Sequence, residues 1–238
     1  MLAYEITSDL QHPTSNRPLS PFARSVRPTS APSRLSRFET GTLRRLDTRE
    51  HVFYEGDPRT HVFQVEEGTI VIYKVLPDGR RQVIGFAYPG DLLGLGTSGD
   101  HLFNAQATSA AKIRCLGAHA LEEAAAHDAA LALKLYQAIS LELSAARNLL
   151  ISIGQQSALE RVAAFLVALD RKTGVADGSG SMIRLPMRRS DIADFLGLTI
   201  ETVSRTLTKL RVMQMIEIVN GTEVHLRART RLEQLAGC

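Results

Sequence analysis

The stretch Ser190–Arg211 constrains the fold of this chain most, because its spacing fits two short helices joined by a tight turn. Apolar residues fall on one side of each expected helix. They are Ile192, Phe195 and Leu196 in the first helix and Ile200, Val203, Leu207 and Leu210 in the second. Gly197 suits the turn because glycine takes a positive φ without steric cost, and Thr199 is of the type that caps a following helix. The pattern predicts a helix-turn-helix whose two helices face one core.

Polar side chains on the other side of the second helix favour a role in reading DNA. They are Glu201, Ser204, Arg205 and Thr208. A carboxylate can accept a hydrogen bond from N4 of cytosine, and a guanidinium can donate to O6 and N7 of guanine in the major groove. A helical hairpin inside a protein core can carry the same apolar spacing, so the polar face is what separates the two interpretations. We therefore predict base contacts by Glu201, Ser204 and Arg205.

Basic residues gather around this motif, although the whole chain is only weakly basic. Its 28 Lys and Arg residues against 25 Asp and Glu residues give a net charge of +3. Between Arg184 and Arg211, however, six basic residues stand against three acidic ones. Local positive charge of this kind is typical of a surface that meets the phosphates of DNA. The predicted phosphate contacts are Arg188, Arg189, Thr199, Thr202 and Lys209.

The segment LTIETVSR, Leu198–Arg205, resembles the recognition segment of the CRP/FNR family of bacterial transcription regulators. Its E-x-x-S-R order is that of the FNR and FixK branch, and the family's base-contacting positions fall on Glu201, Ser204 and Arg205. Members that respond to cyclic AMP usually carry Arg where this chain has Ile200, so the resemblance does not imply their operator. It implies half-sites similar to TTGAT.

The beginning of the chain differs in composition from the rest. Residues 1–36 hold five of the nine prolines together with many Ser, Thr and Arg residues, a composition that buries too little apolar surface to fold by itself. We expect a flexible arm, whose arginines are solvated or touch DNA or polymerase. With two cysteines, no apolar stretch approaching 18 residues and no export signal, we expect a cytoplasmic protein without a membrane span.

Residues 37–118 predict short antiparallel strands, since apolar or alternating runs are separated by turn residues roughly every ten positions. The clearest hairpin turn is Pro77-Asp78-Gly79, which lies between two such runs. This part resembles the jelly-roll effector domain of the same family, which grips a cyclic phosphate in some members. Pro89–Gly94 matches the start of the gripping turn, but no Arg follows before Lys112, and an unbalanced carboxylate at Asp91 would repel a phosphate.

Other cofactors lack their ligands in this sequence. Oxygen-sensing relatives hold an iron-sulfur cluster with N-terminal cysteines, which are missing here, and Cys115 alone cannot hold a cluster. We interpret Cys115 as a small buried residue. Neither His51 nor His61 has a partner at metal-ligand spacing, so both are expected to be half-exposed strand residues. We predict a regulator without a cofactor.

Residues 119–153 predict a long helix that carries a heptad seam. The seam residues alternate at intervals of 4 and 3: Ala132, Tyr136, Ile139, Leu143, Ala146, Leu150 and Ile153. Further leucines widen the apolar surface, so one face can dock on the sandwich while the seam meets a second chain; packing wholly within one chain is the alternative. In the family this is the dimerisation helix. We predict a homodimer interface formed by Tyr136, Ile139, Leu143, Ala146, Leu150 and Ile153.

Residues 154–238 predict a second domain, a winged helix-turn-helix. Gly154 and the two glutamines after it mark the expected hinge. Ser157 and Glu160 form a capping box for a separate helix. After the helix-turn-helix, Asn220-Gly221 lies between two β-rich runs and predicts a two-residue hairpin, which would form the wing.

These patterns predict an α+β chain with an N-terminal antiparallel jelly-roll, a long dimerisation helix and a C-terminal winged helix-turn-helix. They also predict a homodimer that binds palindromic DNA. The resemblance to the FNR and FixK branch implies an activator that recognises TTGAT-like half-sites, works with RNA polymerase and serves low-oxygen respiration or nitrogen fixation. One alternative is a regulator of the same architecture that senses haem or a nucleotide. Another is an enzyme or a cyclic-nucleotide regulatory subunit that binds no DNA, although no nucleophile–base pair, phosphate loop or metal-ligand spacing supports it.

Overall fold

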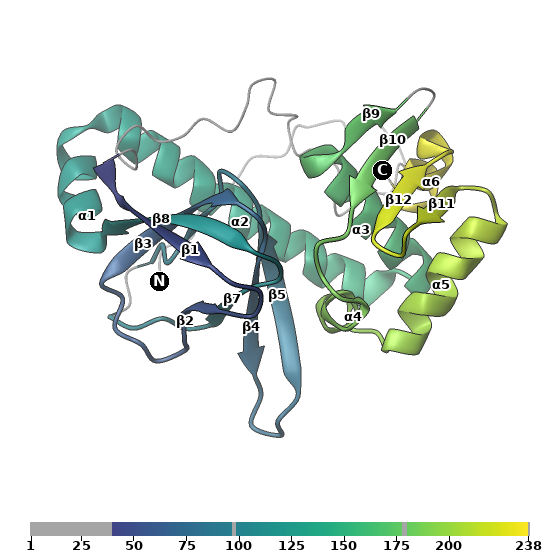
Figure 1. Cartoon of the computed structure of the whole chain (residues 1–238), viewed down its shortest axis with the longest axis horizontal. Coiled ribbons are helices and arrows are strands. Elements are labelled where there is room, and N and C mark those ends of the chain that lie inside the picture. Colours follow the sequence, from purple (N-terminus) through teal and green to yellow (C-terminus); the bar gives the residue numbers. More distant parts are fainter. Residues whose placement is uncertain (1–39, 97–98, 178–179, 238) are drawn as a thin grey trace, which may run out of the picture.

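The computed structural model describes residues 40–96, 99–177 and 180–237, so the arm expected over residues 1–36 lies outside the described residues. Figure 1 shows an N-terminal β-sandwich, a C-terminal domain of helices and a small sheet, and a long helix that runs behind both. This arrangement confirms the predicted fold class. No helix within the described part of the chain is long and apolar enough to cross a membrane.

The sandwich consists of two four-stranded antiparallel sheets. One sheet has the order β1 (Thr42–Leu46), β8 (Ala111–Gly117), β3 (His61–Glu67) and β6 (Leu92–Leu93). The other has the order β2 (His51–Phe53), β7 (Asn104–Ala107), β4 (Ile70–Val75) and β5 (Arg81–Ala87). Apolar side chains from both sheets, among them Val65, Ile70 and Ile113, form the core between them. Strands of alternating burial therefore place their apolar faces inward, as a sandwich requires.

The β4–β5 hairpin has the turn that the sequence predicts. Its turn residue Gly79 has a φ of +83°, a value that favours glycine. The hairpin is long and extends from the sandwich beside α4 of the C-terminal domain (Figure 1). It therefore forms the side of the sandwich that meets the helix-turn-helix.

The single helix expected over residues 119–153 is two helices, α1 (Ala118–His127) and α2 (Ala129–Gln155). The break occurs at Asp128, whose extended backbone leaves its carboxylate free to accept hydrogen bonds from the amides of Ala130 (2.9 Å) and Leu131 (3.1 Å). This is an N-cap in the middle of a helical pattern. Leu121 of α1 and Leu131 of α2 are buried in one cluster with Val62, so α1 folds back onto the sandwich.

The second helix ends within the expected hinge of Gly154, Gln155 and Gln156. Gly154 is helical, and α2 ends at Gln155. The chain then changes direction at Ser157, whose amide donates to the Glu160 carboxylate (2.7 Å) while its hydroxyl accepts from the Glu160 amide (3.4 Å). The predicted capping box is thus confirmed, and it opens α3 (Ala158–Thr173).

The C-terminal domain is built from α3, a four-stranded sheet and three further helices. Its elements are β9 (Val175–Asp177), β10 (Gly180–Arg184), α4 (Arg189–Leu196), α5 (Ile200–Val212), β11 (Ile216–Val219), β12 (Glu223–Leu226) and α6 (Arg229–Leu235), with the sheet order β11-β12-β10-β9. Asn220 and Gly221 both have positive φ, 54° and 72°, as a tight two-residue hairpin requires. The predicted wing is therefore confirmed as the β11–β12 hairpin.

Candidate nucleic-acid interface

The turn between α4 and α5 has the geometry that its residues predict. Gly197 has a φ of +64° and a ψ of 42°, which is the left-handed conformation, and it ends α4. Thr199 then caps α5, because its hydroxyl accepts a hydrogen bond from the Thr202 amide at 3.1 Å. A residue that ends one helix and a residue that begins the next, two positions apart, fix the angle between the two helices.

The buried face of α5 is displaced around the helix from the one that the sequence predicts. Val203, Leu207 and Leu210 are fully buried as expected, and Thr206 is buried with them. The prediction for Ile200 was wrong, because 47% of this residue is exposed. Thr206 shifts the centre of the buried face away from Ile200, which stands at the exposed start of the helix. An apolar side chain therefore borders the polar face at its N-terminal end.

That polar face is open to solvent. Glu201, Ser204, Arg205 and Thr208 are all exposed. The Thr208 hydroxyl donates to the Ser204 carbonyl at 3.0 Å, within the helix. Among the described residues, neither the Glu201 carboxylate nor the Arg205 guanidinium has a hydrogen-bonding or ion-pair partner. The structure thus brings the three residues predicted as base contacts onto one accessible surface.

The residues predicted as phosphate contacts divide into two groups. Arg188, Thr199 and Lys209 are exposed and Thr202 is half-buried, all around the two helix N-termini or along α5. Arg189 differs, because its guanidinium is half-buried and donates from Nη2 to the Gly221 carbonyl at 2.9 Å. Burial lowers the pKa of this group. The Arg189 side chain therefore links α4 to the wing, and its contact with a DNA phosphate stays a prediction.

Two of the three acidic residues of the motif lie away from the polar face. Asp191 and Asp194 of α4 both pair with Arg81 of β5, at 2.5 Å and 3.4 Å. The third acid of the stretch, Glu201, lies on the polar face itself. With two of the three carboxylates turned toward the sandwich, the exposed surface around α5 is more positive than the sequence count indicates, which favours an anionic partner.

Arg161 of α3 holds the helix-turn-helix on the end of the long helix. Its guanidinium donates to the carbonyls of Ile153 in α2 (2.6 Å) and Leu196 in α4 (3.0 Å), and its Nε donates to Gln156 (2.9 Å). Carbonyls at helix C-termini lack partners within the helix, and one cation here satisfies two helix ends. The sequence analysis missed this residue, because an arginine on a helix carries no local signal of such a role.

The turn at Pro89–Gly94 is used differently from a phosphate-gripping turn. The Asp91 carboxylate accepts from the Tyr88 amide (2.8 Å) and from the ammonium of Lys172 on α3 (2.5 Å). The expectation that this carboxylate is unbalanced was therefore wrong. Tyr88 is buried with residues of the C-terminal core. This turn joins the sandwich to the C-terminal domain.

The cysteine and the two histidines considered as cofactor ligands lie on strands of the sandwich. Cys115 is half-buried against the sandwich core, and burial raises the pKa of its thiol. His51 is half-buried and His61 is exposed on its strand. Within the described ranges, no three His, Cys, Asp or Glu side chains come together as a metal site would need.

A β-sandwich joined by a long helix to a winged helix-turn-helix with an exposed polar helix face defines a DNA-binding transcription regulator. Residues 160–235 match the Crp-like helix-turn-helix domain, and residues 43–128 match the cyclic nucleotide-binding domain. The chain belongs to the CRP/FNR family and resembles its FixK members. It is accordingly a regulator and not an enzyme.

Individual relatives support this assignment over nearly the whole chain. The nitrogen fixation regulation protein FixK of Bradyrhizobium diazoefficiens is 40% identical over 218 residues, which cover 89% of this chain and 91% of the relative. The transcriptional activatory protein AadR of Rhodopseudomonas palustris is 39% identical over 175 residues, 74% of this chain and 73% of the relative. The structure of FixK2 from Bradyrhizobium japonicum matches with a TM-score of 0.78 and 38% identity, covering 82% of this chain and 97% of that one.

Proposed function

We propose that this regulator binds palindromic DNA as a homodimer without a cofactor and activates transcription by RNA polymerase. The observation that carries the proposal is the open polar face of α5, with Glu201 and Arg205 unengaged within the described chain. The relatives named above are a nitrogen fixation regulator and a transcriptional activatory protein. On this resemblance, the half-sites are similar to TTGAT and the regulated genes serve low-oxygen respiration or nitrogen fixation.

Base reading in this proposal comes from Glu201, Ser204 and Arg205. Glu201 accepts from cytosine N4, Arg205 donates to guanine, and Ser204 donates or accepts between them. The exposed Ile200 adds an apolar surface beside Glu201. Since the methyl group of thymine is the apolar feature of the major groove, we assign Ile200 to a thymine contact.

Phosphate contacts come from the cations and hydroxyls around this face. Arg188, Thr199, Thr202 and Lys209 surround the reading residues and position the helix without reading sequence. Arg189 stays a predicted phosphate contact, and its bond to Gly221 also fixes the wing beside α4. The wing then lies where it can follow the backbone next to the groove that α5 enters.

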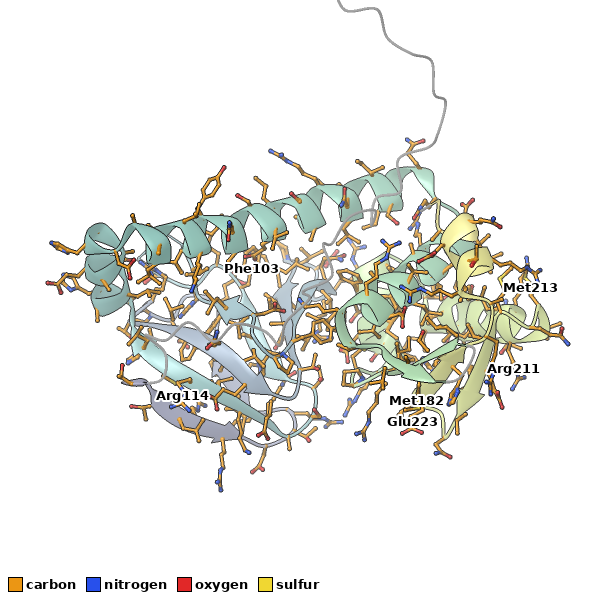
Figure 2. The ribbon with its side chains drawn as sticks, turned by 90° about the horizontal axis from the view of Figure 1, so that it is seen from above. Phe103, Arg114, Met182, Arg211, Met213 and Glu223 are labelled. Atoms are coloured by element: carbon orange, nitrogen blue, oxygen red, sulfur yellow. The ribbon has the colours of Figure 1, made fainter. Side chains whose placement is uncertain are left out.

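The homodimer rests on the exposed seam of α2. Figure 2 shows this helix along one side of the molecule, across both domains, with side chains projecting outward. Tyr136 is 67% exposed, Leu150 is 72% exposed and Leu143 is 48% exposed, although all three are apolar or aromatic. The remaining seam residues Ile139 and Ala146 are also exposed, and Ile153 is half-buried. A second copy of α2 would cover this stripe, as in a coiled coil.

A two-fold axis along the seam determines the symmetry of the DNA site that the dimer binds. Two copies of α5 related by this axis read two inverted half-sites, whose centres lie about one helical turn, or about 34 Å, apart. The operator is therefore a palindrome. Activity without a cofactor is supported by the turn at Pro89–Gly94, where Lys172 already occupies the Asp91 carboxylate.

A binding measurement with purified protein tests the proposal. Without any added ligand, the protein should shift a duplex carrying two inverted TTGAT-like half-sites much more strongly than a scrambled duplex of equal length. A shift that appears only after a cell extract is added would favour a ligand-sensing regulator instead. Equal binding to both duplexes, with or without extract, would contradict sequence-specific reading.

A further inference from the structure

The β4–β5 hairpin of the sandwich holds the first helix of the helix-turn-helix through one arginine. Arg81, at the start of β5, directs Nη1 to the Asp191 carboxylate at 2.5 Å and to the Asp194 carboxylate at 3.4 Å. The three side chains are 26%, 11% and 31% exposed, so the pairs are largely shielded from water. Screening by salt is weaker for such pairs than for surface pairs.

The Arg81 side chain is fixed on its own domain before it reaches α4. Its guanidinium carbon lies 4.2 Å from the centre of the Tyr73 ring. The Tyr73 hydroxyl in turn bonds to Nε2 of His51 at 2.9 Å, and the His51 ring stacks on Tyr54 with centroids 4.2 Å apart. A guanidinium held on such a stack loses little further conformational freedom when it pairs with a carboxylate. The position of the sandwich therefore fixes where Asp191 and Asp194 of α4 can lie.

Neighbouring residues of β5 contact the same helix. The side-chain Nε2 of Gln82 donates to the Asp194 carbonyl at 2.6 Å, which is one of the carbonyls left without a partner at the end of α4. The Phe86 ring meets the Phe195 ring edge to face with centroids 5.4 Å apart. Strand β5 therefore holds α4 by an ion pair, a hydrogen bond and an aromatic contact.

These contacts lie on the side of the motif that faces the sandwich. Asp191 also accepts from the Arg188 amide at 2.9 Å, so the carboxylate paired with Arg81 is the same one that caps α4. At the other end of α4, Arg161 holds the Leu196 carbonyl. With both ends of α4 held, the orientation of α5 is set, and its polar face remains open.

We propose that Arg81 is a positioning residue for DNA reading, which fixes the helix-turn-helix on the sandwich so that a dimer presents its two reading helices at one separation. This inference rests on the proposed homodimer and its palindromic operator. Arg81 touches no DNA. It acts through Asp191 and Asp194, and its loss allows the reading domain to turn about the junction at Gln156.

The test compares operators that differ only in the spacing between two half-sites. The full-length protein should bind best at one spacing and clearly less well when one or two base pairs are added or removed. Arg81→Ala should lose about fivefold or more in affinity at the preferred spacing, the usual lower range of coupling between sites. The affinity of Arg81→Ala for operators with altered spacings should fall much less. The ratio of affinities between the preferred and the altered spacings should therefore decrease.

Two matched variants make the result specific. Arg80→Ala removes a charge from the same hairpin, but Arg80 is exposed and pairs with Asp78 in the turn, so spacing preference should stay as in the unaltered protein. Arg81→Lys should restore only part of the preference, because an ammonium keeps the charge that pairs with Asp191 but loses the planar stack on the Tyr73 ring. If Arg81→Ala is too unstable to purify, Gln82→Ala removes the separate bond to α4 and should relax the preference in the same direction.

Three results would overturn the inference. Arg81→Ala, or Gln82→Ala in its place, could keep the full spacing preference. Affinity could fall by the same factor at every spacing, which is the mark of a lower amount of folded protein. Arg81→Lys could fail to restore any preference. An unaltered protein that binds no palindromic duplex at all would instead contradict the proposed function.

Discussion

At the scale of single residues, the reading face depends on which side of α5 is buried. Val203, Thr206 and Leu207 fix that side, and Glu201 and Arg205 are exposed because they lie opposite. The sequence predicts Gly197 and Thr199 correctly, since a positive φ and a helix cap are local requirements. Ile200 and Arg189 could not be placed from the sequence, because their surroundings depend on contacts that form only in the folded domain.

The proposed division between base reading and phosphate contact predicts two different responses to alanine. Arg205→Ala should lose about 1 to 3 kcal/mol of discrimination at its base pair, because a guanidinium fork to guanine is removed. Lys209→Ala should weaken binding to operator and scrambled DNA alike and lower the salt dependence of binding. Titration of both duplexes at several salt concentrations measures this. If the two variants behaved alike, the assignment of roles would be wrong.

We expect a loss of stability in mild acid from the buried His101 and the half-buried His51. His101 is 7% exposed, and its ring stacks on Phe53 with centroids 3.7 Å apart. Burial lowers the pKa of His101 from its ordinary 6.5, and His51 shifts in the same direction. The unfolded chain therefore takes up protons first, so stability should fall as the pH drops below about 6.5 toward the lowered pKa.

The control for this prediction keeps the ring stack. His101→Phe removes the titrating group, and the free energy of unfolding should then fall less between pH 7 and pH 5 than in the unaltered protein. Urea unfolding at a series of pH values measures the difference. Identical slopes in the two proteins would show that His101 does not contribute.

At the scale of elements, local signals predicted most boundaries. Turn residues gave the β4–β5 and β11–β12 hairpins, and the Ser157 capping box gave the start of α3. The break at Asp128 was missed, because Ala and Leu continue on both sides of it and hide the cap in a helical pattern. Its cause is tertiary, since Leu121 gains a place on the sandwich when the chain turns there.

The proposed seam on α2 predicts that Leu143 is required for the dimer and that Leu141 is not. Leu143→Glu should give a monomer and strongly weaken operator binding, because it places a charge in the middle of the paired helices. Leu141→Glu is the matched control: Leu141 is 62% exposed on the same helix but lies off the seam, so the dimer should persist. Sedimentation over a range of concentrations distinguishes the two. A dimer that survives Leu143→Glu would place the interface elsewhere.

At the scale of the whole molecule, the long helix α2 and ion pairs between the two domains hold the domains together. Figure 2 shows α2 extending along both domains, and the Arg81 and Lys172 pairs join the sandwich to α4 and α3. Arg81 and Asp191 are 110 positions apart, so no periodicity or spacing in the sequence indicates that they meet. Architecture and reading face were therefore predictable, whereas the contacts that orient one domain on the other required the folded structure.

The most direct test of the account is selection of bound fragments from random DNA with purified protein and no added ligand. The account predicts enrichment of one palindrome, with two inverted TTGAT-like half-sites centred about one helical turn apart. Arg205→Ala should relax one position in each half-site while the spacing stays. Enrichment of a single unpaired motif, or of no sequence, would contradict a paired reading helix acting on a symmetric duplex.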